Sequence, residues 1–151
     1  MSNKIELLAP GGDTDSIKAA ILAGADAIYC GLDRFNARNR ASNISFDELL
    51  GVLRLAHKHN CEVFVTVNII IIESEIPSLI SLLNKLVNTS IDGIIIQDLG
   101  LFYLLNKYFK SLKLVLRGIL CFIPYLALSN IVGPKSASSV VIILFSARPV
   151  Y

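Results

Sequence analysis

The side chains best suited to binding chemistry in this sequence lie in one arginine-rich stretch, residues 33–40. Arg34, Arg38 and Arg40 occur there within seven residues, together with Asn36. Guanidinium groups form paired hydrogen bonds to phosphate and carboxylate groups, so the stretch predicts an anion-binding loop. A solvated loop that pairs with acidic residues elsewhere would use the same side chains without any ligand. Both interpretations stay open.

Three further polar side chains end apolar runs: Asn68 ends the third run, and Gln97 and Asp98 end the fourth. In α/β barrels the working residues lie at the carboxyl ends of the strands, so we predict that these three contribute to substrate binding. Helix capping by Asp98, or a turn at Asn68, accounts for them equally well. Glu6 completes the candidate set. We expect it within the first strand, where a buried carboxylate needs a partner.

Nothing in the sequence identifies a catalytic group or a metal site. Cys30, Cys61 and Cys121 are widely separated and form no CxxC pair. His57 and His59 lie before the third apolar run, which places them at the amino-terminal edge of the predicted sheet and away from the site. We expect Cys30 to be a buried structural thiol. No metal site is predicted, and the catalytic residues stay undetermined.

The elements that position these residues alternate regularly. Strands are predicted to begin near residues 5, 26, 61, 91 and 112, with a helix after each of the first four. This alternation is typical of parallel strands joined by right-handed crossovers. A closed barrel and a doubly wound open sheet both show it, so the periodicity does not separate them. No GxGxxG or P-loop follows the first strand, which disfavours a nucleotide-binding sheet.

Helix starts are marked by capping residues and by one proline. Asp13 or Thr14 can cap the first helix and Ser45 the second, and Pro77 lies near the start of a helix over residues 75–87. The polar connection at residues 31–45 is longer than most strand-to-helix loops.

After residue 114 the alternation stops. All acidic residues lie at or before Asp98, whereas the chain after it carries six unclustered basic residues. An unclustered set makes a poor nucleic-acid patch. Arg117 and Pro124 interrupt the apolar run, so we expect no membrane association. With no signal peptide visible, we expect a cytoplasmic protein with free thiols.

Four segments of the chain resemble peptidase family U32. They are ELLAPGG at 6–12, GADAIYCG at 24–31 with RFNAR at 34–38, VFVTVNI at 63–69, and DGIIIQDLGL at 92–101. Each segment is weak alone, but their order and spacing are specific. The resemblance implies an α/β fold: a partial TIM-barrel-like (β/α) repeat of about four and a half units with parallel strands, followed by an irregular apolar tail.

The resemblance also carries functional expectations. Members of this family are similar to peptidases and collagenases, to enzymes that hydroxylate bases of tRNA or 23S rRNA, and to oxygen-independent hydroxylases of quinone biosynthesis. It therefore implies an RNA or peptide substrate and, in the parent protein, a 4Fe-4S cluster. The segments ASN at 41–43 and AHKHNCEVFVTVN at 56–68 favour the rRNA cytidine-hydroxylating branch.

The sequence departs from the family pattern after Leu114. The family continues its fifth strand into H-x-S-x-Q and later carries a cysteine cluster, whereas here VLRGIL follows and no cysteine quartet exists. We therefore expect no cofactor in this chain. Our hypothesis is a frameshifted or truncated product: residues 1–114 form the first part of a U32 barrel, residues 115–151 form a non-family tail, and the isolated chain is inactive.

The alternative is a non-catalytic binding module, or a membrane-associated protein held by its apolar tail. In either case a partial barrel leaves open sheet edges, and such edges favour self-association.

Overall fold

The strands form one parallel sheet in which each strand lies beside the next one along the chain. The computed structural model describes residues 6–37, 43–116 and 141–142. Its elements in order are β1 (Leu8–Gly11), α1 (Thr14–Leu22), β2 (Ala27–Gly31), α2 (Phe46–Lys58), β3 (Glu62–Val67), the 3-10 turn η1 (Glu73–Glu75), α3 (Ile76–Val87), β4 (Gly93–Ile96), α4 (Leu99–Tyr108), β5 (Leu114–Leu116) and β6 (Val141–Ile142).

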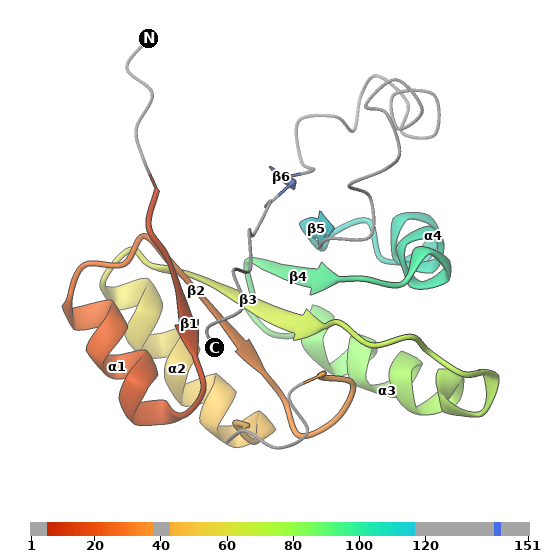
Figure 1. Ribbon diagram of the computed structural model, residues 1–151, viewed down its shortest axis with the longest axis horizontal. Helices are drawn as coiled ribbons and strands as arrows, with labels where there is room; N and C mark the ends of the chain where they lie inside the picture. The colour runs from red at the N-terminus through yellow and green to blue at the C-terminus, as the bar shows by residue number, and fades with distance from the viewer. Residues whose placement is uncertain (1–5, 38–42, 117–140, 143–151) are drawn as a thin grey trace, which may run out of the picture.

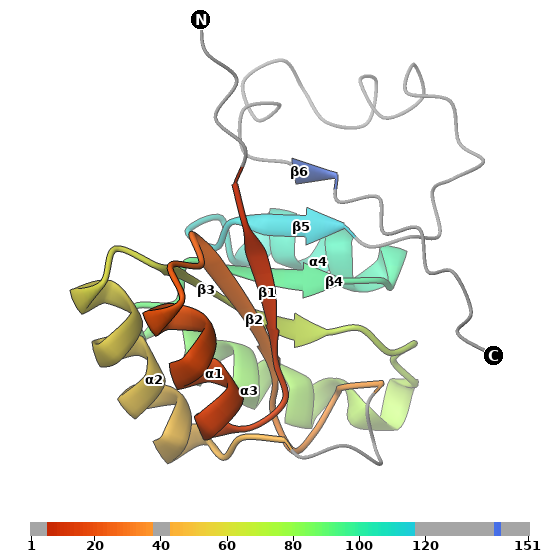
Figure 2. The same cartoon turned by 60° about the vertical axis from the view of Figure 1, so that its left-hand side comes forward.

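The strand order separates the two architectures that the periodicity left open. The order is β1-β2-β3-β4-β5-β6, and every neighbouring pair is parallel. A doubly wound sheet reverses its strand order at a switch point, whereas a barrel adds each strand on the same side of the last. Figures 1 and 2 show the curved sheet with α1, α2, α3 and α4 along one face. The described sheet therefore follows the barrel order, and the α/β prediction with parallel strands is confirmed.

Alternating side chains divide the sheet into two faces. On β3, Val63, Val65 and Val67 are fully buried in the large cluster that also holds the apolar faces of all four helices. Phe64, the residue between the first two valines, belongs to a smaller cluster with Ile95 and Val115 on the other face. Successive strand residues point to opposite faces, so the first set lies under the helices and the second lies on the other face of the sheet.

Side-chain caps start the helices where the sequence predicts them. Asp13 caps α1 and Ser45 caps α2, each in a reciprocal capping box, and Asp98 caps α4. Pro77 lies in the first turn of α3, where its missing N–H leaves no hydrogen bond unmade. The capping side chains accept hydrogen bonds from backbone N–H groups that have no partner within the helix. One polar residue before each capped helix therefore determines where that helix begins.

Two expectations about the ends of the sheet are corrected. Glu6 is exposed and precedes β1, which begins at Leu8 and not at residue 5. The chain just before β1 is held by Asp26, whose carboxylate accepts a hydrogen bond from Leu7 N at 2.9 Å. At the other end, the tail expected to be irregular contains β6, which pairs in parallel with β5. Edge strands expose unpaired backbone groups, and β6 supplies partners for part of that edge.

No helix in the described part of the chain is long and apolar enough to cross a membrane.

Candidate functional site

The carboxyl ends of the parallel strands bring together residues that are far apart in the sequence. The strand registers pair Gly31 with Thr66, and Val67 with Ile96. Continuing the second register by one pair sets Asn68 beside Gln97 at the rim of the sheet. Asn68 is 5% exposed and Gln97 is half-buried. The structure therefore brings together two of the sequence-predicted residues.

Asn68 lines a small hollow at this rim. Gly11, Gly31 and Thr66 also line it, together with Asn36 from the loop after β2. The Asn68 Oδ1 atom accepts a hydrogen bond from Ala37 N at 3.0 Å. The Nδ2 group of Asn68 donates no hydrogen bond to another described residue. Asn68 is therefore both a loop anchor and a candidate contact.

Asn36 holds the loop in place beside the hollow. Its side chain is 3% exposed, and its Nδ2 atom donates to Asn43 Oδ1 at 2.7 Å. The amide packs so closely on Gly31 that a Cβ at position 31 would overlap it. The preceding residue, Phe35, adopts a φ of 63°, which is unusual for an aromatic residue. Arg38 lies outside the described residues.

Asp98 has a structural role that accounts for its position. Its Oδ1 atom accepts a hydrogen bond from Leu101 N at 2.8 Å, which caps α4. Its Oδ2 atom accepts another from Ile71 N at 3.2 Å, which holds the segment after β3. Both carboxylate oxygens are therefore engaged by backbone groups. Glu6, at the amino-terminal side of β1, does not share this rim.

The described histidines are not among the residues that line the hollow, whereas Cys30 is. His57 Nε2 lies 2.9 Å from Asp92 Oδ2, which also accepts a hydrogen bond from Val63 N at 2.7 Å, at the amino-terminal edge of the sheet. Cys30 belongs to the core cluster under the helices, where burial raises the pKa of its thiol to about 12. A thiol with such a pKa stays protonated at neutral pH and is a poor nucleophile.

The residues of this chain do not fit a four-cysteine iron–sulfur cluster. The whole chain has three cysteines, and such a cluster takes four thiolates. Cys30 and Cys61 are both buried free thiols. In the described part of the chain, no three His, Cys, Asp or Glu side chains come together in a way that could hold a metal ion.

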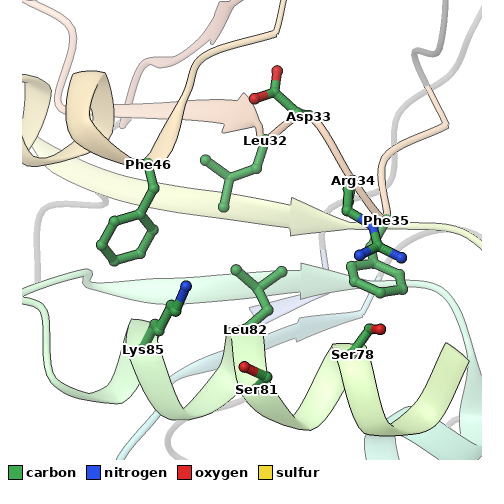
Figure 3. Close-up of a pocket in the computed structure, with 9 residues that line it drawn as sticks. All are labelled: Leu32, Asp33, Arg34, Phe35, Phe46, Ser78, Ser81, Leu82 and Lys85. Carbon is green, nitrogen blue, oxygen red and sulfur yellow. The ribbon is translucent and has the colours of Figure 1, made fainter.

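Arg34 lies in the loop after β2, as the sequence predicts, but it does not line the hollow of Asn68. It lines a pocket of about 310 Å³ between the loop after β2 and helix α3 (Figure 3). Sequence reasoning missed the α3 residues of this pocket, Ser78, Ser81 and Lys85. Their spacing of three and four residues places them on one helix face. This polar helix face is the sequence pattern from which they could have been predicted.

A family model described as Peptidase family U32 matches residues 12–118. The chain belongs to peptidase family U32. A solved structure, that of the U32 peptidase Mk0906, shares the fold with a TM-score of 0.60. It is 15% identical in sequence, and the match covers 78% of this chain and 50% of that one.

Several proteins that are similar to this U32 chain have names that state an activity. The chain is 35% identical over 103 residues to an uncharacterized protease, MJ0090, of Methanocaldococcus jannaschii. It is 38% identical over 100 residues to the 23S rRNA 5-hydroxycytidine C2501 synthase of Escherichia coli. It is 30% identical over 106 residues to a collagenase of Porphyromonas gingivalis. These matches cover 66–70% of this chain and 15–26% of the relatives' lengths.

Proposed function

We propose that this U32 chain contributes the first part of a site that binds an unpaired RNA base, with Asn68 and Gln97 as its contacts. The Asn68 amide, which lines the hollow while its oxygen is anchored by the N–H of Ala37, carries the proposal. Carboxamide side chains combine a donor and an acceptor, and unstacked bases are read through hydrogen bonds to their edges. A fixed amide at a strand end therefore suits recognition of a base.

Two observations favour RNA over a peptide. Peptide hydrolysis needs an activated nucleophile or a polarised water. The thiol of Cys30, which lines the hollow, has a pKa raised by burial, so it stays protonated at neutral pH and is a poor nucleophile. The rRNA-modifying relative is 38% identical, and a tRNA hydroxylation protein of Bacillus subtilis is 32% identical over 98 residues. Both similarities support RNA as the substrate class.

We also propose that turnover requires parts of the barrel that this chain does not supply. The match covers 23% of the Bacillus relative and 15% of the Escherichia relative. The three cysteines do not suffice for the cluster that the family resemblance implies. On this proposal the isolated chain binds RNA without modifying it. Mass spectrometry of RNA incubated with the chain should therefore detect no added oxygen.

Binding by the full chain tests the base site. A fluorescent single-stranded oligoribonucleotide should bind by anisotropy, and a collagen-like peptide of similar length should not. Asn68→Asp keeps the acceptor for Ala37 N–H but removes the amide donors. Loss of one such hydrogen bond costs about 1 kcal/mol, so we expect roughly fivefold weaker RNA binding. Gln97→Glu makes the same change from amide to carboxylate at a half-buried position. It tests the site independently if the Asn68→Asp variant fails to fold.

Asn106→Asp is the matched control, because Asn106 is exposed on α4 and undergoes the same change of charge. It should bind RNA as the wild type does. Equal weakening in all three variants would show that only net charge matters and would contradict the base site. Binding of the peptide in place of RNA would favour the peptidase relatives instead.

A further inference from the structure

The pocket of about 310 Å³ beside α3 has the composition of an anion site (Figure 3). Arg34 enters it from the loop after β2, and Lys85 enters it from α3. Two hydroxyl groups, those of Ser78 and Ser81, lie on the same stretch of α3. The pocket therefore gathers two cationic and two hydroxyl side chains from two separate elements.

A polar face of α3 forms one side of the pocket. The helix packs on the sheet through Leu79, Leu83 and Leu86, which are all buried. Ser78, Ser81 and Lys85 form the neighbouring face, which lines the pocket under the loop after β2. An amphipathic helix keeps its polar side chains on the face turned from the core, and here that face borders the loop after β2 that carries Arg34.

The one acidic residue of the pocket lining is turned away from it. In Figure 3 the Asp33 carboxylate points away from α3, whereas the Lys85 amine extends from the helix toward the sheet. Arg34 is held over the ring of Phe35, with its guanidinium carbon 5.2 Å from the ring centroid. Phe35 itself is buried. The contact with the buried ring favours this direction of the guanidinium.

The rest of the lining is apolar and suits a flat ring. Leu32 and Leu82 lie at the base of the pocket, and Phe46, the first residue of α2, forms one wall. A volume of about 310 Å³ is at the lower end of the range for small-ligand sites, which suits a ligand the size of one nucleotide. In Figure 3 Phe46 and Lys85 lie at one end of the pocket and Arg34 lies at the other, over Ser78, with Leu82 between them.

We propose that this outer pocket binds a nucleotide, with its phosphate at Arg34 and Ser78 and its base against Leu82 and Phe46, near Lys85. Guanidinium groups give charge-assisted hydrogen bonds to phosphate oxygens, and serine hydroxyls donate further ones. The phosphate can belong to a free nucleotide or to an RNA chain, because the binding chemistry is the same. This pocket shares no lining residue with the hollow of Asn68.

Nitrogen-15 NMR of the full chain, titrated with inorganic phosphate, cytidine monophosphate or a short oligoribonucleotide, tests the pocket. We expect the backbone amides of Ser78 and Ser81 to shift with the mononucleotide at lower concentration than with inorganic phosphate. Shifts with the oligoribonucleotide alone would identify a backbone phosphate as the ligand and would also support the pocket. Shifts confined to the Asn68 and Gln97 side-chain amides would overturn it and leave the rim site standing.

Arg34→Gln and Lys85→Gln should each weaken binding of the mononucleotide about tenfold, since each removes one charge-assisted contact. Lys107→Gln is the matched control, because Lys85 and Lys107 are the basic residues in the last turns of α3 and α4. Ser81→Asp, which puts a carboxylate on the exposed lining, should abolish binding. The proposal fails if Lys107→Gln weakens binding as much as Lys85→Gln does, or if no phosphate compound shifts these amides.

Discussion

The side-chain oxygen of Asn68 accepts a hydrogen bond from the backbone N–H of Ala37 at 3.0 Å, which ties the end of β3 to the loop after β2. The two residues are 31 positions apart, so this contact is tertiary and not a local turn. It holds the loop segment that carries Arg34 and Asn36 at the rim. The loop therefore has a defined conformation on both sides of Phe35.

Removing this contact should loosen the loop without unfolding the sheet. Asn68→Ala leaves the Ala37 N–H without its acceptor, and we expect a loss of about 1–2 kcal/mol in the free energy of unfolding. Hydrogen exchange at the Ala37 amide should speed up more than exchange in β3. Asn106→Ala, at an exposed position on α4, is the control and should leave both unchanged. Unchanged exchange at Ala37 in Asn68→Ala would contradict the contact.

The sequence was sufficient to predict features that depend on short stretches of chain. Asp13 and Ser45 bond to groups within three residues, and strand faces follow from alternation, so the caps and the parallel strands were predictable. For Asn68 and Asp98 the sequence left a structural and a binding role open, because both are polar residues after a strand. The contacts with Ala37 and Ile71, far along the chain, show that Asn68 anchors a loop through its oxygen and that both oxygens of Asp98 are engaged by backbone groups.

The position of Arg34 also required the structure. The expected anion-binding loop placed its arginines at the strand ends. The backbone at Phe35 instead has a positive φ of 63°, and Arg34 faces α3. A positive φ at an aromatic residue is disfavoured locally and persists only where tertiary packing supports it. No reading of residues 33–40 alone could therefore assign Arg34 to a pocket with Lys85.

Two glycine substitutions should have opposite effects on stability. A Cβ at Gly93 would lie 2.7 Å from the carbonyl oxygen of Lys113 and 2.9 Å from the ring of Phe64. The carbonyl belongs to the neighbouring chain segment and cannot move freely, so Gly93→Ala should lower the free energy of unfolding by about 1–3 kcal/mol. Urea denaturation measures this. An unchanged midpoint would contradict the close approach of β4 to the segment before β5.

Gly51→Ala is the counterpart within α2. A Cβ there would meet no atom within 4 Å, because Gly51 lies exposed in the helix. Alanine favours the helical backbone over glycine by roughly 0.5–1 kcal/mol, so this variant should unfold at higher urea concentration than the wild type. A destabilised Gly51→Ala variant would mean that the outer face of α2 is covered by something else.

Cys30 should resist alkylation in the folded protein. Burial raises the pKa of its thiol from 9.0 to about 12, so at pH 8 its thiolate fraction is about 1000-fold smaller than in the unfolded chain. Mass spectrometry after iodoacetamide treatment, with and without urea, would quantify modification of Cys30 itself. Rapid modification without urea would contradict both its burial and its exclusion as a nucleophile.

The same pKa shift at Cys30 predicts that stability falls in alkali. The folded-state pKa lies above the unfolded one, so the contribution is fully present below about pH 9 and is lost as pH rises toward 12. Cys30→Ala should flatten this decline in the urea midpoint, although its smaller side chain lowers stability at every pH. An equally steep decline in the variant would assign the effect to other groups.

Stability in acid should depend on the carboxylates of the two capping boxes. Hydrogen bonds from Ser16 lower the pKa of Asp13 below 3.8, and hydrogen bonds from Ser45 lower the pKa of Glu48 below 4.5. Since the folded-state pKa values are the lower ones, this contribution is present above about pH 4.5 and is lost as pH falls through them.

Asp13→Asn keeps a capping acceptor without the charge. Combined with Glu48→Gln, it should reduce the change in urea midpoint between roughly pH 5 and pH 3. Glu73→Gln removes a carboxylate outside both boxes and is the control; an equal reduction there would contradict a specific role for the caps.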